Sequence, residues 1–214
     1  MQITRVKTRH VLFTSSPESS WDLNMHLILG EKNNYLIDTG LGSDDVAEVK
    51  NYIKHDSKPL VLINTHYHWD HVWGNAYVQA MATISHIFCR QMIEEKWDEM
   101  LAKCYMLIHG KAELKLPDLV FDRELYFPED GIRLIYTPGH TIDSISVLDE
   151  KEGVVNMGDN IGDNMEQIVP SLYCDTSYYK DTLNSYNKFD FDTCISGHNR
   201  VLGRDVVDII KNLI

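Results

Sequence analysis

The segment 65–71 constrains the fold of this chain more than any other stretch. Within six residues it carries three histidines and one aspartate: His66, His68, Asp70 and His71. It directly follows the aliphatic run 60–63, which predicts a short buried strand. On a regular strand alternate residues point to opposite faces, so the four side chains could not all meet. We therefore predict an irregular loop at the carboxyl end of this strand, bent so that the four side chains converge.

Three later segments have the same form, an apolar run that ends in a glycine-containing turn. Each turn carries one further histidine or aspartate: His140 after 132–136, Asp159 after 154–157 and His198 after 193–196. Glycine adopts backbone angles that other residues resist, so a neighbouring side chain can turn sharply off the strand. Taken singly, each turn is equally typical of a polar surface loop. Taken together, they predict that four strand ends bring five histidines and two aspartates to one place.

The chemistry of these side chains indicates metal binding. Imidazole nitrogen and carboxylate oxygen are ligands that suit zinc, iron and manganese. More than three such groups in the segment 65–71 indicate two neighbouring ions rather than one. We therefore predict a site for two divalent metal ions, with zinc as the first expectation and iron or manganese as the alternatives.

The order and spacing of these residues resemble the signature of the metallo-β-lactamase-fold hydrolases, from the turn 36–40 to His198. Every metal-binding position of that signature is filled, by His66, His68, Asp70, His71, His140, Asp159 and His198. Within the family, the chain resembles the dinuclear branch that has glyoxalase II-like and lactonase-like members. The resemblance implies an α+β fold, a four-layer αββα sandwich with the metals at one edge between the two sheets.

The resemblance also divides the residues between the two ions. The first ion would be held by His66, His68 and His140. The second ion would be held by Asp70, His71 and His198. Asp159 would bridge the two ions, and Asp38 would support the site from outside. From the residues alone, Asp38 is as readily an ordinary turn residue in an Asp-Thr-Gly sequence.

Composition favours one metallo-hydrolase domain that spans residues 1–214. A chain of 214 residues with 43% hydrophobic content can bury one sizeable core, and no Pro-, Gly- or Ser-rich linker divides it. Apolar residues at helical spacing between 91 and 108 predict a helix, within a helical insertion at about 89–110. Such a stripe is typical of core packing; the alternatives are a lid over the metal pocket or a contact in a homodimer.

The remaining patterns predict short strands and helices along the chain. Strands are expected at 3–9, 24–29, 35–38, 82–88, 119–127, 132–136, 144–148, 154–157 and 193–196. Helices are expected at 43–55, 72–81, 177–188 and 205–213. The polar loop 160–176 offers candidates for the pocket rim: Asn160, Asp163, Asn164 and Tyr173. Tyr67 and Trp69 are expected either on the pocket wall or as filler beneath the loop.

Charge and cysteine usage restrict the partners and the compartment. A net charge of -12 would repel a phosphate backbone, which argues against nucleic acid and favours a small-molecule substrate. No apolar stretch approaches membrane-spanning length, and residues 1–13 lack the features of a secretory signal. Four cysteines lie far apart and are expected as free thiols: Cys89, Cys104, Cys174 and Cys194. Together these features predict a cytoplasmic protein.

These features lead to a hydrolase as the expected function. Two bound ions would lower the pKa of a water molecule from 15.7 to about 7, so that hydroxide attacks the carbonyl of a small ester-type substrate, a thioester or a lactone. Asp70 would carry a proton toward the leaving group. Two departures restrict the substrate: the stretch after His198 is short for a glyoxalase II-like member, and Gly162 stands where the lactonases place a tyrosine.

Other classes of function remain open from the sequence. A persulfide dioxygenase-like oxidoreductase would use a single iron, held by His66, His140 and Asp159. A third expectation is a phosphodiesterase or nuclease, against which the acidic surface argues, or a metal-binding scaffold without catalysis. Metal analysis discriminates between the first two classes, because one iron with oxygen uptake favours oxidation and two ions favour hydrolysis.

Overall fold

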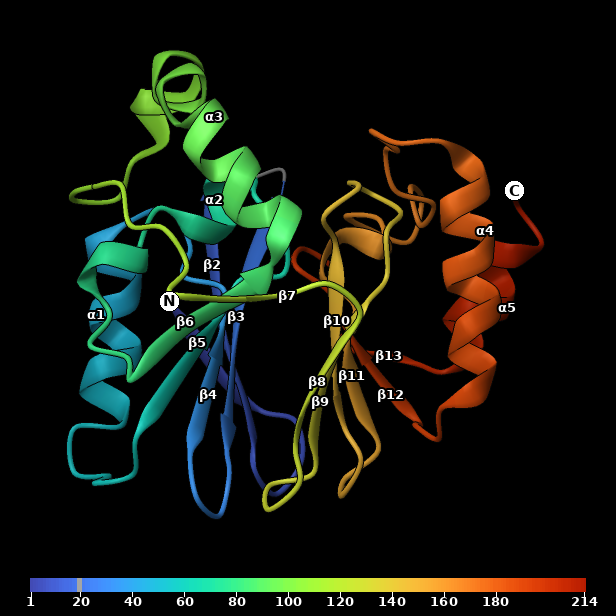
Figure 1. Cartoon of the computed structure of the whole chain (residues 1–214), viewed down its shortest axis with the longest axis horizontal. Coiled ribbons are helices and arrows are strands. Elements are labelled where there is room, and N and C mark those ends of the chain that lie inside the picture. The colour runs from blue at the N-terminus through green and yellow to red at the C-terminus, as the bar shows by residue number, and fades with distance from the viewer. Residues whose placement is uncertain (19–20) are drawn as a thin grey trace.

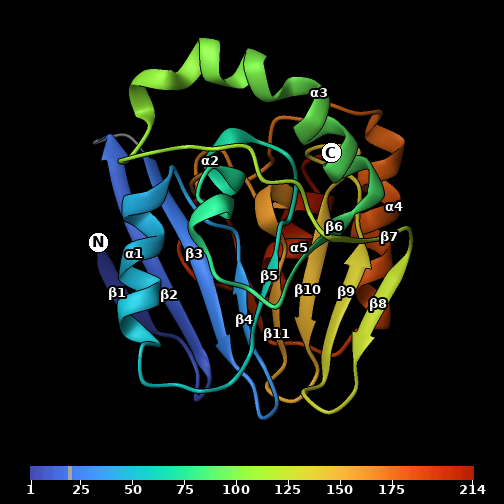
Figure 2. The same ribbon diagram turned by 60° about the vertical axis from the view of Figure 1, so that its left-hand side comes forward.

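Two β-sheets face each other, and helices cover the outer face of each sheet (Figure 1). The computed structural model describes residues 1–18 and 21–214 of the chain. Figure 2 shows the strands of the two sheets running in similar directions, with the connecting loops gathered at two opposite ends. The four layers are therefore helix, sheet, sheet and helix, which confirms the α+β, αββα sandwich predicted from the sequence.

The first sheet has seven strands that follow one another in chain order. They are β1 (Gln2–Arg5), β2 (His10–Glu18), β3 (Trp21–Leu29), β4 (Asn34–Ile37), β5 (Leu60–Ile63), β6 (Ala82–His86) and β7 (Leu119–Phe121). The strands β1 to β4 pair antiparallel, and β4 to β7 pair in parallel. Parallel neighbours need crossover connections, and helices lie in each of them.

The second sheet has six strands, in the order β13-β12-β11-β10-β9-β8. Their bounds are β8 (Glu124–Phe127), β9 (Ile132–Tyr136), β10 (Ile145–Asp149), β11 (Val154–Asn156), β12 (Thr193–Ile195) and β13 (Leu202–Gly203). All neighbours are antiparallel except β11 and β12, which are parallel and joined through a helix.

The helices divide between the two outer layers. Those beside the first sheet are α1 (Ser43–Tyr52), α2 (Trp69–Val72) and α3 (Ile87–Cys104), and those beside the second are α4 (Thr176–Ser185) and α5 (Asp205–Lys211) (Figure 1). Short 3-10 turns lie at Asn75–Tyr77, Tyr105–Leu107, Gly158–Asn160 and Tyr186–Lys188. No helix formed by residues 1–18 and 21–214 has the length and apolar character needed to span a membrane.

Burial on both faces explains why the central strands read as continuous apolar runs. In β5, Val61 and Ile63 pack between the sheets beside Leu134, whereas Leu60 and Leu62 pack on the side of α1. Successive residues of a strand point to opposite faces, so both sets must be apolar. A further core fills the space between the second sheet and the helices α4 and α5. Each such aliphatic side chain contributes about 1.5–3 kcal/mol when fully buried.

Two predicted elements are corrected by the structure. The single strand expected at 119–127 is two strands, because β7 pairs with β6 of the first sheet and β8 with β9 of the second, so the chain crosses between sheets after Phe121. The helix expected at 72–81 is wrong, since α2 already ends at Val72. The chain then passes so close to Thr39 that a Cβ on Gly74 would lie 2.3 Å from the Thr39 carbonyl oxygen.

The strand β2 was missed by the sequence analysis. Two serines and Pro17 at its end lower its strand propensity and hide any alternation. Pairing with β1 on one side and β3 on the other overrides that local preference.

The apolar stripe of α3 is confirmed as core packing. Ile93, Trp97 and Met100 are buried in one cluster with Trp73. This cluster lies behind α2, so α3 supports the loop that carries the histidines rather than standing free of the domain.

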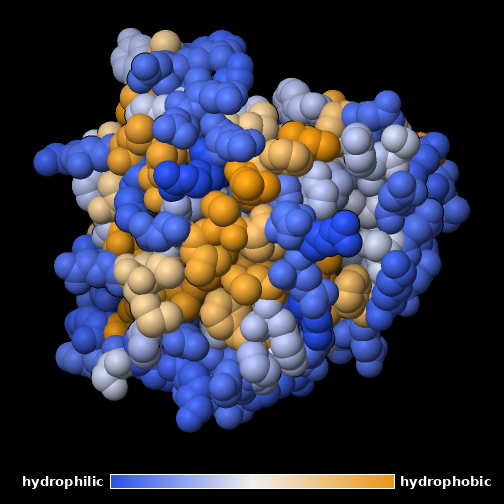
Figure 3. Space-filling model, in the orientation of Figure 1, coloured by the Kyte–Doolittle hydropathy of each residue, from blue (hydrophilic) through white to orange (hydrophobic). Residues whose placement is uncertain are grey.

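One apolar patch lies on the face seen in Figure 1. Figure 3 shows it in the middle of that face, where β7 and the start of α3 lie. Ile87, Phe88, Leu119 and Val120 of these two elements are between 37% and 44% exposed. Because β7 is also an edge strand, apolar side chains and unpaired backbone groups are exposed together here. The homodimer predicted from the sequence stays a prediction.

Candidate metal centre

The loop that follows β5 is anchored by Asp38, the residue after β4. Asp38 Oδ1 accepts the backbone N–H of Thr65 at 2.8 Å, and Oδ2 accepts the Thr65 hydroxyl at 2.7 Å. The same Oδ2 lies 2.9 Å from His71 Nδ1. Asp38 has φ of 62°, a left-handed conformation that costs a non-glycine residue about 1–3 kcal/mol. These contacts agree with the supporting role predicted for Asp38.

Asp159 lies at the centre of the converging strand ends. Its Oδ2 is 3.5 Å from His66 Nε2, 3.4 Å from His71 Nε2, 3.7 Å from His140 Nε2 and 3.2 Å from His198 Nε2. All five residues are buried, and none is more than 8% exposed. The structure therefore brings together residues from all four predicted segments.

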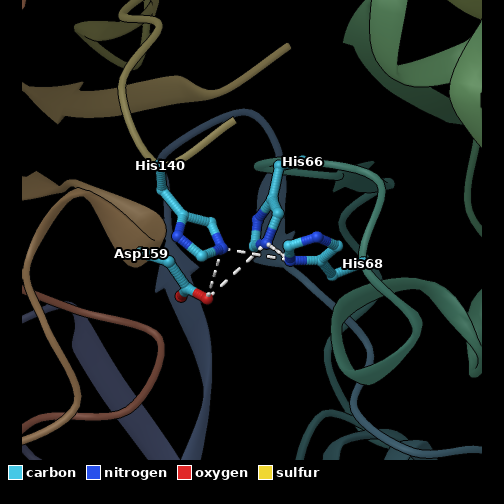
Figure 4. Close-up of side chains that lie close together, drawn as sticks. All are labelled: His66, His68, His140 and Asp159. Carbon is cyan, nitrogen blue, oxygen red and sulfur yellow. Dashed lines mark hydrogen bonds and ion pairs between the residues drawn. The ribbon is translucent and has the colours of Figure 1, made fainter. Parts of the chain in front are cut away.

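The first group of donor atoms is drawn in Figure 4. His66, His68 and His140 point toward one another and toward Asp159. His68 Nδ1 is 3.0 Å from His66 Nε2 and also 3.0 Å from His140 Nε2. One possible metal-ligating atom from each of these four residues lies within 4.8 Å of those of the other three.

The second group lies directly beside the first. Asp70 Oδ2 is 3.3 Å from His198 Nε2 and 3.5 Å from His71 Nε2. One donor atom from each of these three residues again lies within 4.8 Å of the others. Asp159 Oδ2 approaches histidines of both groups, and its role as a bridging ligand stays a prediction.

The outer nitrogens of four histidines are held by partners of their own. These partners are Thr65 Oγ1 for His66, Asp38 Oδ2 for His71, the Ser171 carbonyl for His140 and the Asp22 carbonyl for His198, at 3.1, 2.9, 2.7 and 2.8 Å. Each contact fixes the ring and leaves Nε2 free to point inward. Ser171 and Asp22 act through the backbone, so no side-chain pattern could have indicated them.

Two buried polar atoms in the centre, His71 Nε2 and Asp159 Oδ1, have no hydrogen-bond partner among the described residues. An unpaired buried polar atom costs about 1–3 kcal/mol. A divalent cation would use such lone pairs, since nitrogen and carboxylate oxygen are its preferred ligands. The donor set therefore fits the metal ions that the sequence predicts.

Electrostatics in the centre differ between the two groups. Burial lowers the pKa of His66 well below its ordinary value and that of His68 to about 4, so both imidazoles are neutral ligands at pH 7. Burial would also lower the pKa of His71, but the carboxylates of Asp159 and Asp70 outweigh it and raise that pKa well above the ordinary value. The second group thus favours positive charge, which a divalent ion supplies as well as a proton does.

A cavity of about 610 Å³ opens onto the centre. Its walls are formed by five of the seven candidate ligands, Trp69, Leu213 and residues of the segment 162–173, without any residue of α3. The five ligands are His68, Asp70, His140, Asp159 and His198. Asp163 and Tyr173 lie on the wall, as predicted. Trp69 is on the wall too, whereas Tyr67 packs in the cluster behind the loop.

Asn160 is not a rim residue. It is 1% exposed, and its side-chain oxygen accepts the backbone N–H of His140 at 2.8 Å. Its amide nitrogen donates to the Thr137 carbonyl at 2.7 Å. Asn160 therefore ties the Asp159 turn to the His140 turn, a role that the polar composition of the loop did not distinguish from a solvent-facing one.

Comparison with known proteins identifies the family. The family model described as the metallo-beta-lactamase superfamily matches residues 22–198. The chain belongs to the metallo-beta-lactamase superfamily. Membership supports a hydrolytic enzyme, and the fold together with the histidine and aspartate clusters implies binding of divalent metal.

Individual relatives agree with this assignment. The probable metallo-hydrolase MJ0888 of Methanocaldococcus jannaschii is 28% identical over 149 residues, which are 64% of this chain and 66% of that protein. Among solved structures, a metallo-beta-lactamase from Hirschia baltica has a TM-score of 0.77 at 18% identity. The match covers 99% of this chain and 96% of the Hirschia chain. FIM-1 from Pseudomonas aeruginosa, in a mono-zinc form, has a TM-score of 0.74 at 20% identity, covering 99% and 93%. These structures show the superfamily fold.

Proposed function

We propose that this superfamily member is a dinuclear metal-dependent hydrolase of small ester-type substrates, a thioester or a lactone. The observation that carries the proposal is the position of Asp159, whose Oδ2 approaches four histidine nitrogens within 3.7 Å while its buried Oδ1 has no partner among residues 1–18 and 21–214. One carboxylate in contact with both groups is what a bridging ligand requires.

The two groups would hold one ion each, most naturally zinc. The first ion would be held by His66, His68 and His140. The second would be held by Asp70, His71 and His198. Asp159 would contact both. When bound, the ions would lower the pKa of a water molecule and polarise the substrate carbonyl.

Asp70 is the residue proposed to move the proton. Burial would raise its pKa, but His71 and His198 outweigh burial and lower it to about 2, so the carboxylate is ionised and can accept a proton. It lines the cavity, where its Oδ atoms reach the space in which substrate would lie. The proton that Asp70 accepts would pass to the leaving thiolate or alkoxide.

The charge of the residues that line the cavity favours a neutral substrate over an anionic one. Asp163 and Glu166 lie on the wall, and no lysine or arginine is among the described residues that line it. A phosphodiester would meet these carboxylates with no basic side chain to offset them. Like charges held close together repel, so a neutral thioester or lactone fits better.

Substrate screening with metal analysis tests the proposal. Purified protein, loaded with zinc, iron or manganese and assayed for bound metal, is offered thioesters, lactones, β-lactams and phosphodiesters. We expect about two ions per chain and turnover of a thioester or lactone above the others. One iron per chain with oxygen uptake on a persulfide would replace the proposal with the dioxygenase alternative.

The role of Asp70 has its own test. Asp70→Asn keeps the size of the side chain but cannot accept the proton, so we expect turnover to fall by about 100-fold, the contribution typical of general acid-base catalysis. Bound metal should fall much less. Unchanged turnover at full metal content would remove Asp70 from the proton path.

A further inference from the structure

A buried chain of hydrogen bonds starts on the second sheet, passes through two histidines of the first sheet and returns to the second, and none of its four residues lines the cavity. It runs from Asp149 at the end of β10 through His10 of β2 and His26 of β3 to Asn156 at the end of β11. None of the four is more than 3% exposed. His10 Nε2 lies 2.7 Å from Asp149 Oδ2, His10 Nδ1 lies 2.9 Å from His26 Nε2, and His26 Nδ1 lies 3.3 Å from Asn156 Nδ2.

The last link reaches the metal centre. Asn156 Oδ1 accepts the backbone N–H of Gly158 at 2.8 Å. Gly158 has φ of +52°, and a Cβ there would lie 3.1 Å from Thr65 Cβ, so the turn is both left-handed and tightly packed. The next residue is Asp159. The chain therefore ends on the turn that aims the central carboxylate.

The direction of every hydrogen bond follows from the two ends. Asp149 can only accept, because His10 and Arg9 outweigh burial and hold the pKa of its carboxyl well below the ordinary value. His10 therefore donates from Nε2. Burial lowers the pKa of His26 well below its ordinary value, so that ring carries a single hydrogen. At the other end a backbone N–H can only donate, which orients the Asn156 amide so that its nitrogen donates to His26 Nδ1. The single hydrogen of His26 therefore lies on Nε2 and is donated to His10 Nδ1, so the directions read from the two ends agree.

The far end is anchored by charge and does not need a cation. Arg9 forms an ion pair with Asp149, whose Oδ1 also accepts the backbone N–H groups of Lys151 and Glu152 at 2.8 and 3.2 Å. His10, Asp149 and Glu152 have donor atoms close enough for a metal ion. The Arg9 guanidinium already balances that charge, so a divalent ion there would meet a fixed positive neighbour.

We propose that His10, His26 and Asn156 form a relay of positioning residues that connects the Arg9–Asp149 ion pair to the Asp159 turn and sets the metal affinity of the centre. The relay rests on the proposed function only in taking Asp159 as a metal ligand. It requires both imidazoles to be neutral with the hydrogen on Nε2. One additional proton would break a link, because two donors would then face each other between His26 and Asn156.

The tautomers are the first test. Nitrogen-15 NMR of the full-length protein, labelled at histidine, reads the hydrogen position on each ring. We expect His10 and His26 both as Nε2–H tautomers at pH 7, with Nδ1 unprotonated. Asn156→Asp, whose ionised carboxylate can only accept, should reverse His26 to Nδ1–H. A proton on Nδ1 of either ring in the natural protein would overturn the relay.

Zinc affinity is the second test, measured by chelator competition with Zn²⁺ alone. Asn156→Leu removes both of the last hydrogen bonds, and we expect about 10-fold weaker zinc binding, the low end of the effect of an outer partner on a metal site. The matched control is Asp130→Asn, which removes a carboxylate that accepts the backbone N–H groups of residues 31–33 at the same end of the sandwich as Asp149. The control should bind zinc as the natural protein does.

Unchanged affinity in Asn156→Leu, or an equal loss in Asp130→Asn, would reject the positioning role. If Asn156→Leu does not fold, the tautomers of the natural protein and of Asn156→Asp still decide the matter. Neither readout depends on hydrolysis. A protein that binds zinc and shows the expected tautomers but hydrolyses no ester would reject the proposed function and retain the relay.

Discussion

Two buried clusters of histidine and aspartate lie at opposite ends of the sandwich and differ in their hydrogen-bond balance. Around Asp159 the imidazole nitrogens point at one another, and His71 Nε2 and Asp159 Oδ1 have no partner among the described residues. Around Asp149 both carboxylate oxygens, and both ring nitrogens of His10 and of His26, have a hydrogen-bond partner. The same residue types therefore make a site that lacks positive charge at one end and a closed network at the other.

A buried cluster of histidine and aspartate is therefore not identified as a metal site by its composition alone. Arg9 supplies the positive charge at the Asp149 end, and no lysine or arginine lines the cavity at the Asp159 end among the described residues. A donor cluster without an internal cation is the one that fits metal.

The largest expected effect is at the cluster around Asp159, the open cluster. His140→Ala removes a candidate ligand, and we expect hydrolysis to fall by about 10⁴-fold, equivalent to about 5.5 kcal/mol in the barrier. Thermal unfolding of the metal-free protein should change little, because the side chain satisfies no buried donor of the core. Activity that survives at full strength would contradict the assignment of this cluster as the catalytic centre.

At the cluster around Asp149, the closed cluster, the expected loss is in stability. Asp149→Ala leaves Arg9 and His10 without their buried partner, and breaking such a pair costs about 4 kcal/mol of unfolding free energy. Urea unfolding with zinc removed measures it. A loss below about 1 kcal/mol would mean that the network contributes little to folding.

A third buried carboxyl belongs to neither cluster and predicts a pH effect. Both oxygens of Asp143 are buried without a partner among the described residues, and burial raises its pKa to about 6. Between about pH 4 and pH 6 the folded state binds the proton and the unfolded state does not, so stability falls as pH rises through this range. Asp143→Asn removes the effect. We expect the variant to be more stable by about 3 kcal/mol at pH 8 and equal to the natural protein below pH 4.

The smallest effect expected is the linkage between zinc and folding. Zinc at 100 times its dissociation constant should raise the unfolding free energy by about 2.7 kcal/mol. Urea titrations with and without zinc measure this increase. It should be clearly smaller in His140→Ala, which loses a ligand of the first ion, and unchanged in Asp130→Asn. An undiminished increase in His140→Ala would place the zinc elsewhere.

Much of the open cluster could be predicted from the sequence, and none of the closed one. His66 to His71 are crowded into one loop, and glycine marks the three other turns, so local patterns pointed to a common place. His10, His26 and Asn156 sit singly inside strands, where one polar residue on an inward face carries no periodic signal. Only the pairing of β2 with β3, and the stacking of one sheet on the other, brings them together.

Errors in the fold have the same origin. The division of 119–127 between two sheets depends on which partner strand each half finds, and that choice is tertiary. The end of α2 depends on the approach of Gly74 to Thr39, residues far apart in the chain. Asn160 was expected on the rim because its neighbours are polar, but its two hydrogen bonds join turns that only the folded chain places together.

The cavity wall comes mainly from one stretch, 162–173, whereas the donor atoms come from other strand ends. Three backbone groups tie that stretch to the ligand turns: the Ser171 carbonyl and the Tyr173 N–H contact His140, and the Gly162 carbonyl accepts from Asn199. The side chains of the stretch can change while these backbone contacts and the coordinating frame stay the same. Selection for a new substrate and selection for retained metal therefore act on separate parts of the chain. Such a division lets one scaffold diversify its chemistry repeatedly without rebuilding the machinery that performs it.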